Sequence, residues 1–80
     1  MNRKIKLIWD FRGPAAQNTA IHHEKHLKEF SALEGLELKI TGHQNYSDVY
    51  SIAYLVVNES EMIAVRDALK PHRGELFEEN

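Results

Sequence analysis

The sequence predicts an α+β domain, a two-layer sandwich in which an antiparallel sheet carries two helices on one face. Apolar and polar residues alternate in residues 4–11 and again in 36–41, and a nearly continuous apolar run fills residues 49–57. Helical periodicity separates and follows these segments. With 80 residues, 42% of them hydrophobic, the chain has room for one domain, residues 1–80, and for no second core.

A Gly-Pro turn separates the first predicted strand from the first predicted helix. Residues 4–11 place Trp9 and the apolar residues two apart from it on one face of a strand. Gly13 permits a sharp turn, and Pro14 suits the first position of a helix. Residues 15–33 then predict a helix that ends before Gly35. The apolar stripe of this helix comprises Ala16, Ala20, His23, Leu27 and Phe30.

The second half of the chain predicts two strands, a helix and a weak final strand. Residues 36–41 form the first of these strands, and the polar residues 42–48 are predicted as a loop. Residues 49–57, rich in Val, Ile and Tyr, predict a central strand. Asn58 and Glu61 form a capping box for a helix that Pro71 ends. The tail, residues 72–80, could add a short edge strand. This order, βαββα(β), is that of the ferredoxin-like fold.

The composition of the chain argues against some classes of partner and indicates a cellular compartment. Ten basic and 12 acidic residues give a net charge of −2, which argues against nucleic acid as the partner. The absence of cysteine excludes disulfides and thiolate metal sites. No segment has the length or composition of a signal peptide or a membrane span, so we expect a cytoplasmic protein with no membrane partner. No motif indicates a cofactor.

The predicted topology brings several polar residues to one edge of the sheet. The end of the first strand, the start of the first helix, the loop after the second strand and the end of the second helix share this edge. Two Arg side chains beside a helix N-terminus favour a small anionic ligand. An ordinary strand-to-helix turn would also explain part of this set. The expected ligand-binding residues are Asp10, Arg12, Gly13, His43, His72 and Arg73.

The histidines of the first helix support two further hypotheses. His23 lies in the centre of the apolar stripe, where it could form an acid–base pair with Asp10 in a small enzyme. A neutral imidazole packed in the core is the alternative. His22 and His26 are four residues apart and could hold a metal ion on one helical face. Such a site needs a further ligand, for which the candidates are His43 and Glu29.

The central strand predicts an interaction surface. Two helices cover only one face of the sheet, and the other face should be polar if water reaches it. Residues 49–57 are apolar on both faces, so the uncovered face is predicted to carry an apolar patch with aromatic members. This patch predicts a homodimer through the open sheet face, with a monomer as the alternative. The predicted interface residues are Ile8, Tyr50, Ile52, Tyr54 and Val56.

Two short motifs carry a resemblance to other proteins. Residues 9–14, Trp-Asp-Phe-Arg-Gly-Pro, and residues 71–74, Pro-His-Arg-Gly, are similar to the first and last motifs of a group of short, uncharacterised bacterial proteins. No activity attaches to that group, so the resemblance implies no function. The sequence predicts a homodimeric, non-enzymatic binding module that recognises an anionic group or a protein partner. A small enzyme that uses His23 and Asp10, and a His-based metal-binding protein, are the alternatives.

Overall fold

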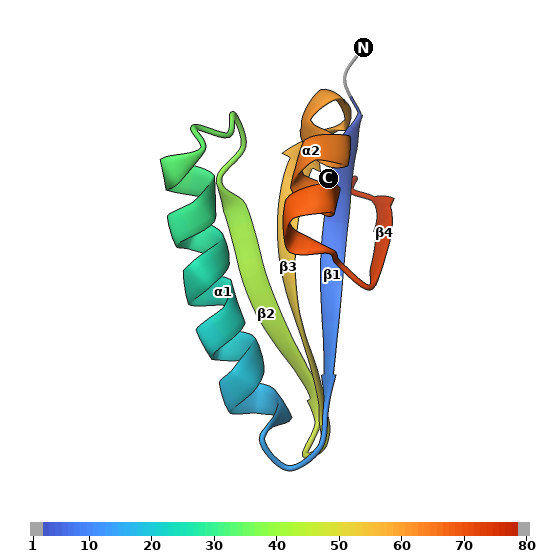
Figure 1. Ribbon diagram of the computed structural model, residues 1–80. Helices are drawn as coiled ribbons and strands as arrows, with labels where there is room; N and C mark the ends of the chain where they lie inside the picture. Colours follow the sequence, from blue (N-terminus) through green and yellow to red (C-terminus); the bar gives the residue numbers. More distant parts are fainter. Residues whose placement is uncertain (1–2, 79–80) are drawn as a thin grey trace.

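A computed structural model describes residues 3–78 of the chain, which form a four-stranded antiparallel sheet and two helices (Figure 1). The order of elements is β-α-β-β-α-β, so the predicted α+β class is confirmed. The short last strand, which the sequence left open, is present. The strands are β1 Lys4–Arg12, β2 Ile40–Ser47, β3 Tyr50–Asn58 and β4 Arg73–Leu76, and the helices are α1 Ala16–Leu33 and α2 Glu59–Leu69.

The strands lie in the order β2-β3-β1-β4, so β1 and β3 are the central pair. Their register runs from Lys4 opposite Asn58 to Arg12 opposite Tyr50. The short strand β4 pairs with the outer edge of β1, and β2 pairs with the other edge of β3. The prediction that residues 49–57 form a central strand is therefore confirmed.

The prediction for the second strand is wrong by several residues. Residues 36–39 lie outside any strand, and the polar residues predicted as a loop make up most of β2. This strand is at the edge of the sheet, and most of its side chains are exposed. Backbone pairing with β3 holds it in place, so it needs no apolar alternation. Pro14 is also displaced from its prediction, because α1 begins two residues later, at Ala16.

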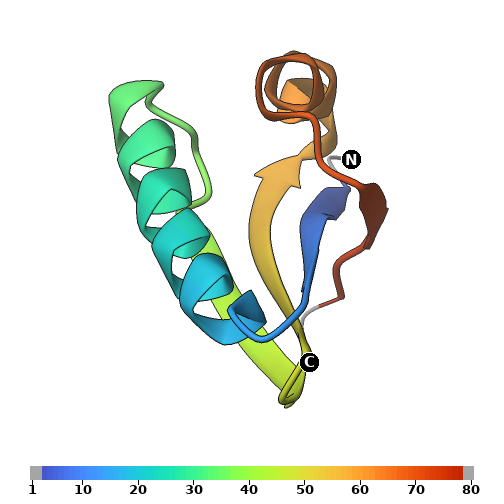
Figure 2. The same cartoon turned by 60° about the horizontal axis from the view of Figure 1, so that its bottom comes forward.

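Both helices pack on the same face of the sheet but lie apart from each other (Figures 1 and 2). The helix α1 lies mainly over β2 and β3, and α2 lies over β1 and β3. Within residues 3–78, neither helix is long and apolar enough to cross a membrane. The core between the helices and the sheet consists of Leu7, Trp9, Ala20, Leu27, Leu36, Ala53, Leu55, Val57 and Val65.

The helix-free face of the sheet buries its apolar residues beneath its own polar side chains. Ile8 and Ile52 are each 1% exposed and Val56 is 0% exposed in a single chain. The Lys6 ammonium lies 4.3 Å above the Tyr54 ring, and the Arg12 guanidinium lies 4.2 Å above the Tyr50 ring.

These long side chains lie over the apolar layer of the helix-free face because they come from alternate positions of the two central strands. The predicted exposed apolar patch is therefore wrong. The homodimer stays a prediction, now without that support, and sedimentation equilibrium would test it.

Candidate functional site

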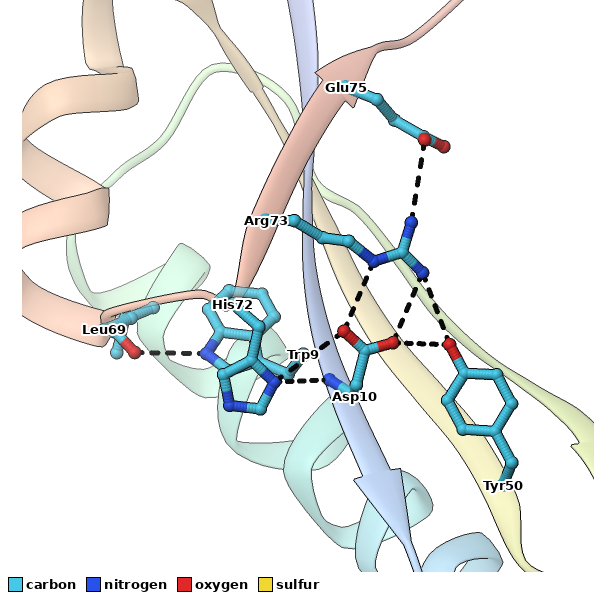
Figure 3. A network of polar contacts seen from close by, with 7 residues as sticks. All are labelled: Trp9, Asp10, Tyr50, Leu69, His72, Arg73 and Glu75. Carbon is cyan, nitrogen blue, oxygen red and sulfur yellow. Dashed lines mark hydrogen bonds and ion pairs between the residues drawn. The ribbon is translucent and has the colours of Figure 1, made fainter.

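Asp10 is the centre of a polar network between β1, β3 and β4 (Figure 3). The Tyr50 hydroxyl donates a hydrogen bond of 2.5 Å to Asp10 Oδ1. Arg73 donates through Nε to Oδ2 at 3.2 Å and through Nη2 to Oδ1 at 3.3 Å. Arg73 Nη2 also lies 3.4 Å from the Tyr50 hydroxyl, to which it donates. We call Asp10, Tyr50, His72 and Arg73 the Asp10 network.

The register of the sheet explains why these side chains meet. Asp10 lies between Trp9 and Phe11, which face the helices, so its carboxylate points to the helix-free face. Its direct neighbour on β3 is Ile52, and Tyr50 is two residues away on the same face. Arg73 is opposite Ile8 and is likewise displaced by two residues. Both partners therefore approach Asp10 along the diagonals of an antiparallel sheet, a distance that long side chains can span.

His72 completes the network at the start of β4. Its backbone N–H donates to the carbonyl oxygen of Ile8 at 2.9 Å. Its ring Nδ1 accepts a hydrogen bond of 2.8 Å from the backbone N–H of Asp10. The imidazole thus pairs a backbone donor of β1 that lies beyond the end of β4. Because Nδ1 is an acceptor, the neutral ring carries its proton on Nε2.

Within the network, the mutual contacts of Asp10, Tyr50 and Arg73 fix the protonation states of Asp10 and Tyr50 near neutral pH. The hydrogen bonds from Arg73, and next from Tyr50, hold the pKa of Asp10 below its ordinary value despite partial burial. The same contact with the Asp10 carboxylate raises the pKa of Tyr50. Asp10 is therefore ionised and Tyr50 protonated at neutral pH. These hydrogen bonds stabilise the pairing of β1, β3 and β4, and groups with such fixed protonation states are poorly suited to proton transfer.

Asp10→Asn should lower the free energy of unfolding by about 1–3 kcal/mol at pH 7, because the hydrogen bonds to a charged acceptor are lost. The folded-state pKa of Asp10 lies below the unfolded value, so this stabilisation is present above the unfolded pKa and is lost as the pH falls through the folded pKa. Urea denaturation at several pH values should show the difference between wild type and variant shrinking below pH 4. Asp67→Asn, at an exposed carboxylate on α2, is the control and should change little. A difference that is independent of pH would contradict this assignment.

The structure brings together only part of the predicted ligand-binding set. Asp10, His72 and Arg73 are in contact, and Arg12 reaches them through the Tyr50 ring. Gly13 forms the turn after β1 with a positive φ of 113°. Its N–H donates to the carbonyl oxygen of Val49, so it is used in the fold. Tyr50 is a predicted interface residue, and its place in the network depends on a register that the sequence does not reveal.

The prediction that His43 joins this set is wrong. Because residues 40–47 form β2, His43 lies opposite Ala53 and faces α1. There its Nδ1 lies 2.7 Å from Glu24 Oε1, and the Thr41 hydroxyl donates to Glu24 Oε2 at 3.2 Å. Partial burial opposes ionisation of Glu24, but these hydrogen bonds and nearby Lys28 outweigh it and lower the pKa of Glu24.

The prediction of an acid–base pair between His23 and Asp10 is also wrong. The two side chains are on opposite faces of β1, because Asp10 alternates with the residues that His23 contacts. The His23 ring lies 5.0 Å from the Trp9 ring and 5.4 Å from the Phe11 ring, and its Nε2 is buried without a hydrogen-bond partner among the described residues. Burial, and then the charges of nearby histidines, lower the pKa of His23. It is a neutral imidazole packed between aromatic rings.

The predicted three-ligand metal set is not formed in the described part of the chain. Residues 3–78 contain no group of three or more His, Asp or Glu side chains placed to hold a metal ion. His22 and His26 do meet, with their Nε2 atoms 2.9 Å apart. Glu29 approaches the other ring nitrogen of His26, at 3.7 Å, and His43 is bound to Glu24.

A pocket of about 340 Å³ opens between α2 and β4, beside the Asp10 network. Its apolar lining includes Ile5, Leu7 and Met62. Gly74 faces the pocket because it is opposite Leu7, which points towards the helices. A Cβ at position 74 would lie 3.4 Å from Leu7 Cδ2 and 3.7 Å from Ile5 Cγ2, so a side chain here would pack against the apolar lining of the pocket. The polar lining comes from Arg66, His72, Arg73 and Glu75.

The two motifs that carry the resemblance to short bacterial proteins meet in space. Asp10 belongs to the first motif, and His72 and Arg73 belong to the second, so the Asp10 network joins them. The resemblance itself stays a prediction. Comparisons with protein-family models, with curated proteins and with solved structures found no significant match to this chain.

Proposed function

We propose that this chain is a ferredoxin-like, non-enzymatic binding module that holds a small amphipathic anion in the pocket between α2 and β4. The strand order β2-β3-β1-β4 supports the ferredoxin-like arrangement. The observation that carries the proposed function is the pocket itself, whose volume of about 340 Å³ is within the range of small-molecule sites. Its apolar lining would hold the body of the ligand, and the polar groups beside that lining would select a negative head group.

Arg66 and His72 are the residues proposed to contact the anion. Arg66 is on α2, where it forms an ion pair with its exposed neighbour Asp67, at 3.5 Å. Such a surface pair contributes little and can be exchanged for a ligand. The His72 ring is oriented by its Nδ1 contact with Asp10, which leaves the Nε2–H as a donor. The Arg73 guanidinium is already bound to Asp10, so the anion contact expected of it is assigned to Arg66 instead.

Titration of the ¹⁵N-labelled protein with octanoate would test this function. We expect amide shift changes at Gly74, Met62 and Arg66, with little change at the far edge strand β2. Gly74→Leu should fill the pocket and weaken octanoate binding at least tenfold. The fold should stay intact, because a β-strand accommodates a residue larger than glycine. Arg66→Gln should weaken the binding of octanoate and leave that of neutral octanol unchanged.

Leu76→Ala is the matched control, because Leu76 is in the same strand and 55% exposed. It should bind octanoate like the wild type. Far-UV circular dichroism establishes that each variant is folded. Octanoate binding that survives Gly74→Leu, or that the Leu76→Ala control also loses, would contradict the assignment of the ligand to this pocket.

A further inference from the structure

The surface of α1 carries a pair of histidines whose ring nitrogens face each other. His22 and His26 are one helical turn apart and both exposed, and the His26 side chain is 57% exposed. Their Nε2 atoms are separated by 2.9 Å, and the rings are nearly perpendicular, with centroids 4.5 Å apart. Without a metal, one ring donates its Nε2 proton to the other. When the donor ring carries its proton on Nδ1 instead, both Nε2 lone pairs are free, and a metal ion between them would have two nitrogen ligands already positioned.

The spacing of the two nitrogens favours one coordination geometry. A metal–imidazole bond is about 2.0–2.1 Å long, so two nitrogens at right angles around a metal lie about 2.9 Å apart, whereas a tetrahedral angle requires about 3.3 Å. The observed separation of 2.9 Å therefore corresponds to a right angle. Right angles between ligands are typical of tetragonal Cu²⁺ and Ni²⁺ sites, and tetrahedral angles are typical of Zn²⁺.

Glu29 supports the same ring orientation from the other side. Its Oε2 lies 3.7 Å from Nδ1 of His26, three residues earlier on the same helix. A carboxylate at this nitrogen favours the tautomer that carries the proton on Nδ1. The Nε2 lone pair is then free to bind a metal. Metal-bound histidines usually donate this other N–H to a carboxylate, and Glu29, now 3.7 Å away on the side that does not face His22, could accept it after a small side-chain shift.

We propose that His22 and His26 form a bidentate site for Ni²⁺ or Cu²⁺ on the surface of α1, with water in the remaining positions. The described residues supply no third ligand of the His, Asp or Glu type, which agrees with a site that leaves several positions to water. The ion would bridge one turn of α1 and stabilise that helix. This site is on α1, away from the residues that line the pocket between α2 and β4, and does not depend on a ligand there.

Thermal unfolding of the full chain with and without Ni²⁺, in a buffer free of chelators near pH 7.5, would test the proposal. We expect Ni²⁺ to raise the melting temperature by several degrees, and Zn²⁺ at the same concentration to raise it less. His22→Gln and His26→Gln should each abolish the Ni²⁺ shift. His43→Gln, at an exposed histidine bound to Glu24, should retain it in full.

Two further measurements separate this site from unspecific binding. Paramagnetic broadening by substoichiometric Cu²⁺ should be confined to residues around His22 and His26 in the ¹⁵N spectrum. Glu29→Gln should weaken Ni²⁺ affinity severalfold without changing the fold. The proposal is wrong if Ni²⁺ causes no shift, if the shift survives either single replacement, or if Zn²⁺ stabilises the protein more than Ni²⁺ does.

Discussion

Trp9→Ala is expected to lower the free energy of unfolding by about 3–5 kcal/mol, the usual cost of removing a buried indole. Trp9 is 4% exposed and is part of the core between the helices and the sheet. Its ring contacts His23 of α1, and its Nε1–H donates to the carbonyl oxygen of Leu69 at the end of α2, at 3.1 Å. The two helices lie apart (Figure 2). Trp9 therefore connects both of them to β1 through these two contacts.

Urea denaturation followed by far-UV circular dichroism would measure this loss, since Trp9 is the only tryptophan and fluorescence would vanish with it. Trp9→Phe keeps most of the apolar contact and removes the hydrogen bond to Leu69, so it should cost less than Trp9→Ala. Total stabilities of small domains are about 5–15 kcal/mol, so the Ala variant should be close to unfolding at 37 °C. A Trp9→Ala midpoint equal to that of Leu76→Ala, at an exposed site, would show that Trp9 does not connect the helices.

The elements predicted well are those whose core-facing residues recur with a clear period. In β1 the core residues Leu7 and Trp9 are two apart, and in α1 the buried residues lie on one helical face, so the periodicity of both elements in the sequence is strong. The strand β2 could not be found this way, because it is an edge strand that is held by the backbone of β3 and has mostly exposed side chains. The same polar residues are typical of a loop, and only the partner strand distinguishes the two.

The contacts of the candidate site that follow from the order of the strands could be predicted from the sequence. The contacts that depend on the pairing register could not. The end of β1 and the start of β4 must meet in this order of strands, which brings Asp10 to His72 and Arg73. The partnership with Tyr50 depends on a pairing register that no sequence pattern reveals. The alternation of β1 places Asp10 and Trp9 on opposite faces of the strand, and the apolar stripe that contains His23 packs on the Trp9 face. The predicted pair between His23 and Asp10 therefore conflicts with the predicted strand itself.

The helix-free face shows why counting apolar positions misleads. The sequence places Ile8 and Ile52 on this face, and they are there, but almost no water reaches them. The methylene stems and charged ends of long side chains cover apolar neighbours efficiently. Here Lys6 and Arg12 each lie over a tyrosine ring, so the pattern predicted an open apolar face where the protein has a closed one.

Gly42→Ala should lower the free energy of unfolding by about 1–3 kcal/mol, as overpacking does, although Ala normally suits a strand better than Gly. Gly42 is opposite Tyr54 in the sheet, and a Cβ at position 42 would overlap the end of the Tyr54 ring. Lys6, on the neighbouring strand, lies over this ring, so a shift of Tyr54 away from the new methyl group would disturb that contact.

Replacing Tyr54 by a small residue should abolish the destabilisation that Gly42→Ala causes. In a Tyr54→Ala background, Gly42→Ala should be neutral or stabilising by up to about 1 kcal/mol, so that a double-mutant cycle yields a large coupling between the two positions. Gly74→Ala is the matched control on the opposite edge strand, where the new methyl group would make ordinary contacts, and it should not destabilise the protein. An equal cost of Gly42→Ala in both backgrounds would mean that the backbone of β2, rather than the Tyr54 ring, requires glycine. A coupling energy equal to the cost of Gly42→Ala alone would show that position 42 requires glycine because the Tyr54 ring packs there. This ring is part of the layer that closes the helix-free face.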